Sequence, residues 1–290
     1  MHTDRVFNMV EDRTLDLELY FVTEILKLRS LHYGYWDEPP RQVSLDDVRQ
    51  AQARFTERLL ALIPNGVRTI LDIGSGIGDN ARALTAAGYV VTAISPENNH
   101  PKYYGPGGTD NITFHNLKFE DFESAGHFDL ILISEALNYF DHEFGLHKFR
   151  RLLIPGGHLL ITGMFSSSDS APFAHNFPVA TLPYVRLAAA HGFSLLHAVD
   201  ITQNVLPTMT LTHDAIQSYV RPAVALMERY LAASAPWKLR LLKVLFGGRI
   251  REAQHILTYY ERRVDPHFFS TRMRYATLLL RGHGAVSAAA

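Results

Sequence analysis

The chain has 290 residues, 47% of them hydrophobic, and its 28 Lys and Arg nearly balance 29 Asp and Glu, for a formal net charge of −1. This composition is that of a folded chain with a sizeable core and excludes a disordered one. The complete lack of cysteine excludes disulfides, thiolate metal sites and a cysteine nucleophile. Charges interrupt every apolar stretch near the N-terminus, so we expect no signal peptide and a cytoplasmic location.

Helical spacing of apolar residues predicts two helices near the N-terminus, over residues 15–30 and 44–64. Ser44 and Asp47 form a capping pair that begins the second helix, and Pro64 closes it. The aromatic segment between the two helices ends in two prolines and is expected to be a loop.

From residue 69 onward, short apolar runs alternate with helical patterns. The runs predict seven strands, at 69–73, 89–94, 111–117, 128–134, 156–165, 193–201 and 270–281. The helical patterns lie at 79–87, 142–153 and 181–192. Such alternation implies right-handed crossovers. We therefore predict an α/β fold, a Rossmann-like, mainly parallel seven-stranded sheet with helices on both faces.

Residues 212–263 have a mostly helical pattern, interrupted at Gly247–Gly248, and are inserted before the last strand. An insertion of this length is expected to be a lid. The predicted domains are an N-terminal helical cover (1–64), an α/β core (65–211), a helical lid (212–268), and the last strand with a loose tail (269–290).

Charge is unevenly distributed, because residues 236–290 carry a net +7 and residues 1–235 a net −8. Within the basic part, the helix over 236–257 presents one apolar face, formed by Leu239, Leu242, Phe246, Ile250 and Ala253. We expect this face to pack on the core as a lid, with contact to a membrane surface as the less favoured alternative. Nucleic acid is disfavoured as a partner, because the main domain has no run of Lys and Arg with interleaved aromatic residues.

The strongest motif is the run Ile70–Gly78, a strand that enters a glycine turn and opens a helix. Glycines allow a ligand to approach the backbone, and the helix N-terminus offers unpaired N–H groups. In a dinucleotide fingerprint the third glycine would stand at Asp79, where a carboxylate would face the pyrophosphate. NAD and FAD are therefore disfavoured.

The G-x-G-x-G spacing after Leu-Asp-Ile resembles motif I of class I S-adenosylmethionine (SAM) methyltransferases. Residues 128–140, 152–162 and 192–208 resemble later motifs of that family. The aromatic segment 32–36 is similar to a loop of its small-molecule branch, which includes tocopherol, sarcosine and terpenoid methyltransferases and cyclopropane fatty-acid synthases. The resemblance implies SAM as cofactor and methyl transfer to a small molecule.

The resemblance also implies a set of cofactor-binding residues: Tyr33, Asp72, Gly74, Ser75, Gly76, Gly78, Ser95, Glu97, Phe119, Glu135 and Asn138. Two positions depart from the family pattern. Ser95 stands where an acidic residue usually binds the ribose, which leaves the contact open between Ser95 and Glu97. Lys118 stands where an Asp usually meets the adenine, so we expect Phe119 and loop backbone to serve instead.

His142, Tyr139 and His32 are the candidates for a general base near the acceptor. His142 and His147 are five residues apart and miss the spacing of a zinc helix, so no metal site is predicted. The expected reaction moves a methyl group to O, N or C of a small, largely apolar metabolite, such as an isoprenoid or aromatic natural product. A lipid-modifying or cyclopropane synthase-like enzyme at a membrane surface and a non-catalytic SAM-binding protein are the alternatives, and homo-oligomerisation stays open.

Overall fold

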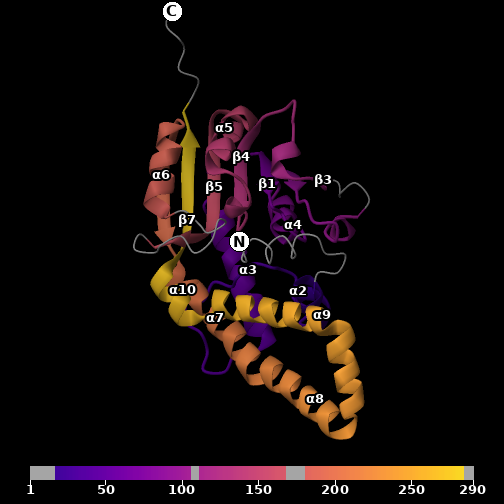
Figure 1. Cartoon of the computed structure of the whole chain (residues 1–290). Coiled ribbons are helices and arrows are strands. Elements are labelled where there is room, and N and C mark those ends of the chain that lie inside the picture. The colour runs from indigo at the N-terminus through magenta and orange to yellow at the C-terminus, as the bar shows by residue number, and fades with distance from the viewer. Residues whose placement is uncertain (1–16, 106–110, 168–179, 284–290) are drawn as a thin grey trace, which may run out of the picture.

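The computed structural model describes residues 17–105, 111–167 and 180–283, and its central feature is one seven-stranded sheet (Figure 1). The strand order is β3-β2-β1-β4-β5-β7-β6, and only β7 runs antiparallel to its neighbours. The strands are β1 (Thr69–Ile73), β2 (Val90–Ile94), β3 (Ile112–His115), β4 (Phe128–Ser134), β5 (Leu153–Ser166), β6 (Phe193–Asp200) and β7 (Met273–Gly282). The predicted α/β fold is confirmed.

Helices cover both faces of this sheet. They are α3 (Leu45–Ala61), α4 (Asp79–Ala86), α5 (His142–Leu152) and α6 (Thr181–Ala190). Alternate side chains of β1 point to opposite faces, so Leu71 packs with residues of α5 and α6 whereas Ile70 packs with residues of α3 and α4. Because both faces are buried, the central strands are continuously apolar.

The N-terminal helices differ in part from their predicted extents. The helix expected over 15–30 is represented in the described residues by α2 (Leu17–Tyr20) and the π-helical turn η1 (Phe21–Ile25), and residues 26–30 are not helical. The capping pair of α3 is confirmed, because the Asp47 N–H donates to Ser44 Oγ at 3.2 Å and the Ser44 N–H donates to Asp47 Oδ2 at 2.8 Å.

Between β6 and β7 the chain forms α7 (Thr202–Ala215), η5 (Ile216–Val220), α8 (Arg221–Ser234), α9 (Pro236–Arg263) and α10 (Pro266–Arg272). Helix α7 begins ten residues before the predicted lid, and the predicted interruption at Gly247–Gly248 is wrong, since α9 continues through it. In Figure 1, α8 lies at the end of the molecule away from the sheet. None of the described helices is long and apolar enough to cross a membrane.

The expected packing of the basic helix on the core is not what the structure has. Leu242, Phe246 and Ile250 on its predicted core face are 39%, 45% and 37% exposed. The physical reason is that α8, itself without a buried residue, is the element against which α9 packs.

Candidate active site

The glycine turn after β1 has three residues with left-handed backbone. Gly74, Gly76 and Gly78 have φ of 74°, 55° and 82°, values that residues with a Cβ rarely adopt. A Cβ on Gly74 would lie 2.3 Å from that of Ala136, and one on Gly78 would lie 2.8 Å from the Tyr104 ring. A Cβ on Gly76 would meet a single leucine methyl at 3.8 Å. Internal packing therefore requires the first and third glycines, whereas the second faces space that a ligand can fill.

Tyr104 holds the turn against the sheet. Its hydroxyl donates to Oγ of Ser75 at 2.7 Å, and its ring stacks on Phe114 with centroids 4.0 Å apart. The Ser75 N–H donates to the carbonyl of Ile94 on β2 at 3.0 Å. Ser75, a predicted cofactor residue, therefore serves at least to fix the conformation of the turn.

Asp72, at the end of β1, has the buried carboxyl group beside this turn. Its side chain is 1% exposed, and neither carboxylate oxygen has a hydrogen-bond partner among the residues that the structure describes. Burial, together with the nearby charge of Asp79, raises the pKa of Asp72 to about 8. A buried polar group without a partner is costly. A cationic amino group on a ligand beside Gly76 would supply the partner, so the residues present fit the cofactor that the sequence implies.

His32 forms a buried ion pair with Asp79, the first residue of α4. Its Nε2 lies 3.0 Å from Oδ2 of Asp79, and its Nδ1 lies 2.8 Å from the carbonyl of Tyr33. Burial alone would lower the pKa of His32, but Asp79, the Tyr33 carbonyl and Glu135 together outweigh it and raise that pKa. Burial alone would raise the pKa of Asp79, but His32 lowers it. The pair therefore ties the aromatic loop to α4. A role for His32 as base stays a prediction, and these contacts at both ring nitrogens do not favour it.

Ser95 and Glu97 both follow β2, as expected for ribose contacts. Ser95 is buried, and its Oγ lies 2.8 Å from Nδ1 of His100. Asn116 Nδ2 donates to the carbonyl of Ser95 at 2.8 Å and to that of Glu97 at 3.1 Å. Because the Glu97 side chain is only half-buried, it is the more accessible of the two candidates.

Phe119 lies in the 3-10 turn η3 (Phe119–Asp121) after β3 and is buried in the core. Its ring centroid is 4.8 Å from that of Phe140 and 5.3 Å from that of Phe149. Lys148 donates to the carbonyl of Glu120 at 2.8 Å, which fixes the turn. Core packing explains the Phe119 ring, and its contact with adenine stays a prediction.

Glu135 lies at the carboxyl end of β4 in a left-handed conformation, φ 60°, which is uncommon for a residue with a side chain. Its carboxylate accepts hydrogen bonds from the hydroxyl of Tyr275 on β7 and from the Tyr33 N–H at 3.5 Å. Its own N–H donates to the carbonyl of Thr162 at 2.8 Å. Burial raises the pKa of Glu135, although the Tyr275 hydroxyl opposes this shift. Strained backbone of this kind persists where the surroundings fix it, often at functional sites.

Three further candidates follow β4. Oδ1 of Asn138 is buried without a hydrogen bond to any described residue. The Tyr139 side chain is exposed. The His142 ring meets Tyr184 edge to face at 5.5 Å, and burial lowers the pKa of His142. Its imidazole is therefore neutral at neutral pH and able to accept a proton.

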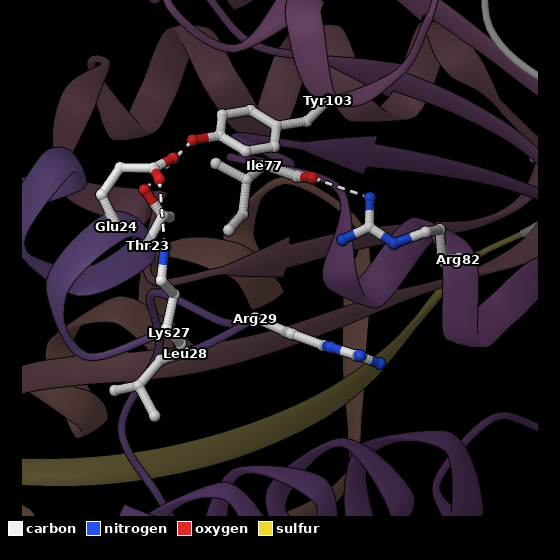
Figure 2. A pocket seen from close by; sticks show the side chains of 8 residues that line it. All are labelled: Thr23, Glu24, Lys27, Leu28, Arg29, Ile77, Arg82 and Tyr103. Atoms are coloured by element: carbon white, nitrogen blue, oxygen red, sulfur yellow. Dashed lines mark hydrogen bonds and ion pairs between the residues drawn. The ribbon is translucent and has the colours of Figure 1, made fainter.

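A pocket of about 380 Å³ opens beside the glycine turn (Figure 2). Ile77 and Arg82 line it from the turn and α4, while Thr23 and Tyr103 line it from the facing segments. Arg82 donates to the Ile77 carbonyl at 2.9 Å, and the Tyr103 hydroxyl donates to Oγ1 of Thr23 at 3.3 Å. The N-terminal segment thus forms a wall of the cavity next to the turn.

The structure therefore joins His32, Tyr33 and Glu135 in one contact network next to the glycine turn. Tyr275, which no sequence pattern predicts, joins this network through Glu135 and Tyr33. Tyr104, also not predicted, contacts the glycine turn itself through Ser75. No cluster of three or more His, Asp or Glu suited to a metal ion occurs in the described part of the chain. A sheet of this order, an open glycine turn and a buried unpaired carboxylate together define the cofactor site of a class I SAM-dependent methyltransferase.

Comparison with known proteins agrees with this class. A family described as "Methyltransferase domain" matches residues 45–205, more than half of the chain, and the chain belongs to this family. The O-methyltransferase rstn1 of Aspergillus nomiae NRRL is 28% identical over 193 residues, which cover 59% of this chain and 83% of that protein.

Solved structures with this fold include the cyclopropane synthase MmaA2 from Mycobacterium tuberculosis, with a TM-score of 0.69 at 15% identity, covering 95% of this chain and 98% of that one. Geranyl diphosphate methyltransferase in complex with GPP and sinefungin has a TM-score of 0.64 at 14% identity, covering 96% and 99%. The chain is thus a methyltransferase with SAM as its methyl donor.

Proposed function

We propose that the protein transfers the SAM methyl group to an oxygen atom of a small, largely apolar metabolite, of the isoprenoid or aromatic natural-product kind. The observation that carries the donor half of this proposal is the buried, unpartnered carboxylate of Asp72 beside the open side of Gly76. When bound, SAM supplies an electrophilic methyl group on a positively charged sulfur.

The residues of the chain then bind and orient the two reactants and exclude water from them. Asp72 pairs with the amino group of the donor, the glycine turn lies along it, and Glu97 accepts hydrogen bonds from its ribose. Tyr33 and Glu135 join the aromatic loop to the end of β4, since the Tyr33 N–H donates to the Glu135 carboxylate. Holding the reactants in fixed geometry in this way accounts for much of the rate of such a transfer.

The acceptor half rests on His142 and on an apolar cluster. A hydroxyl is a weak nucleophile and must lose its proton, and the neutral His142 imidazole is the proton acceptor that we assign to it. Oxygen is favoured because the relative rstn1 is an O-methyltransferase. An apolar skeleton is favoured because Tyr33 and Met164 pack, partly buried, on a cluster that contains Phe55 and Tyr275.

The test is incubation of the protein with methyl-labelled SAM and a metabolite extract, followed by mass spectrometry of labelled products. We expect a labelled methyl ether or ester in the organic phase. His142→Gln should lose it while still binding S-adenosylhomocysteine in calorimetry. Cofactor binding without a labelled product from any extract would instead support a non-catalytic SAM-binding protein. Label in phospholipid would support a lipid-modifying enzyme.

A further inference from the structure

Helices α8 and α9 form a hairpin that exposes many large apolar side chains. Every residue of Arg221–Tyr230 is exposed, and α8 buries none of its residues. The exposed apolar residues of α8 are Val224, Leu226, Met227 and Tyr230, and those of the first half of α9 are Trp237, Leu241, Leu242, Val244, Leu245 and Phe246. Monomeric soluble proteins rarely expose so much contiguous apolar surface unless it binds something.

The first half of α9 has two apolar faces. Lys243 Nζ donates to Glu228 of α8 at 2.6 Å, which places the side of α9 that carries Lys243 and Phe246 toward α8. At 3.6 residues per turn, Trp237, Leu241, Val244 and Leu245 fall within roughly 100° of arc, on the side opposite Phe246. Their exposures are 64%, 48%, 81% and 63%. We call these four residues the outer strip. Phe246 and Leu242 lie outside this strip and are less exposed, at 45% and 39%.

Cations flank the outer strip on both edges. By the same helical geometry, Lys238 falls about 20° beyond Leu245, and Arg240 falls about 40° beyond Val244 on the other edge. Both cations are exposed, and Lys238 Nζ lies 5.5 Å from the centre of the Trp237 ring. Residues 221–251 together carry seven Lys and Arg against one Glu, whereas the rest of the chain carries 21 Lys and Arg against 28 Asp and Glu, a net −7.

We propose that the outer strip docks the protein on an anionic lipid surface. An apolar strip edged by Lys and Arg suits the boundary between acyl chains and anionic headgroups, and a tryptophan suits that depth. The acidic remainder of the chain is repelled by the same lipids, so the hairpin end turns toward the membrane and the sheet away from it. The proposal does not depend on the identity of the methyl acceptor.

A second copy of the chain is disfavoured as the occupant of this face. In a symmetric dimer the same patch meets itself. Such an interface would bring two sets of cations together, and like charges across an interface oppose association. An anionic bilayer, in contrast, complements the charge of the hairpin and covers its apolar strip.

The test is co-sedimentation of the full chain with vesicles of phosphatidylcholine alone and of phosphatidylcholine mixed with phosphatidylglycerol. We expect binding to the anionic vesicles only, weakened by salt. Tryptophan emission gives an independent readout, because the chain has two tryptophans and Trp36 is already buried. A blue shift on adding anionic vesicles is expected, and it should disappear in Trp237→Phe.

Two variants separate the contributions of charge and apolar surface. Lys238→Gln with Arg240→Gln should weaken vesicle binding about twenty-fivefold, taking about fivefold per cation. Leu241→Ser with Val244→Ser should abolish it. The matched control is Leu182→Ser with Arg186→Glu on α6, where both side chains are exposed and a leucine and a cation are again replaced. This control should bind vesicles like the wild type.

Three results would overturn the proposal. The first is absence of sedimentation with anionic vesicles, and the second is an effect of the α6 control as large as that of the α9 variants. The third is a dimer in analytical ultracentrifugation that Leu241→Ser with Val244→Ser converts to a monomer, because the strip would then be the interface between two copies.

Discussion

The buried carboxyl group of Asp72 destabilises the folded protein when no ligand pairs with it. Its pKa is about 8 in the fold and about 4 when unfolded. The folded state therefore holds a proton that the unfolded state releases between pH 4 and 8, and unfolding is favoured as pH rises through that range. We predict that Asp72→Asn raises the free energy of unfolding at pH 7 by about 2–4 kcal/mol, while cofactor binding is lost.

Urea unfolding of both proteins from pH 5 to 9 checks this. The difference between variant and wild type should grow by about 1.4 kcal/mol per pH unit up to pH 7 and level off above pH 8. Asp129→Asn is the opposite control, because hydrogen bonds from Thr69 and Arg68 lower the pKa of Asp129 despite its partial burial. A constant difference across the pH range would show that Asp72 is already ionised.

His142 is the second residue whose titration predicts a measurable effect. Burial places its pKa below the usual 6.5, so it is deprotonated at pH 7 and becomes protonated only in more acidic solution. We predict that kcat/KM is constant from pH 7 to 8 and falls tenfold per unit once pH drops below that pKa. His142→Gln should lower kcat by about 10²–10⁴ without this pH dependence, and Tyr139→Phe serves as the neighbouring control. Full activity of His142→Gln would show that His142 is not the general base.

At the scale of elements, the strand–turn–helix unit of β1 and α4 predicts different outcomes for two glycines. Gly76→Ala places a methyl group in space that the protein leaves open, so the fold should lose about 1–2 kcal/mol from backbone strain and most of its cofactor affinity. Gly78→Ala drives a methyl group into the Tyr104 ring as well and should lower the melting temperature further. Calorimetry with S-adenosylhomocysteine and thermal unfolding separate the two effects. Equal destabilisation by both variants would contradict the assignment of Gly76 to the ligand.

The elements that sequence predicted best are those with the sharpest contrast between apolar and polar residues. β1 and β4 have the predicted bounds, because each is a continuous apolar run that ends at a turn. The helical pattern begins later in the sequence than α7 does in the structure. Pro207 and several β-branched residues weaken the local helical signal of α7, but the burial of Val205 and Met209 stabilises the helix nonetheless. The Gly247–Gly248 pair likewise costs helical stability without ending α9.

At the scale of the whole molecule, the site is assembled from strands far apart in sequence. The glycine turn was predictable because its residues are contiguous in sequence and the backbone of the turn itself requires each glycine. Tyr275 was not predictable, because its contact with Glu135 exists only when β7 inserts between β5 and β6. The pair of His32 and Asp79 likewise depends on the aromatic loop folding over α4. Local patterns thus predict the glycine turn better than the contacts that Glu135 and His32 make with distant segments.

The same assembly implies that the hairpin contributes little to global stability. The two ends of the hairpin are joined by Glu261, which accepts a hydrogen bond from Gln217 at 3.2 Å and forms an ion pair with Arg221. A six-residue Gly–Ser linker, spanning roughly 13 Å, can therefore replace residues 222–260. Because α8 buries no residue, while Val205, Met209 and other core residues are retained, we predict one cooperative transition with a free energy of unfolding within about 1 kcal/mol of the wild type, as for surface changes generally.

Urea unfolding and calorimetry with S-adenosylhomocysteine check this deletion. Cofactor affinity should be retained, because Asp72 and the glycine turn lie outside the deleted segment, and vesicle binding should be lost. The matched comparison is Val205→Ala with Met209→Ala in α7, where both side chains are fully buried and truncation should cost several kcal/mol, at about 2–5 kcal/mol for a buried Met alone. A deletion variant as unstable as this double variant, or one that no longer binds the cofactor, would contradict the prediction. The apolar residues of the hairpin would then be stabilising the sheet and its cofactor site.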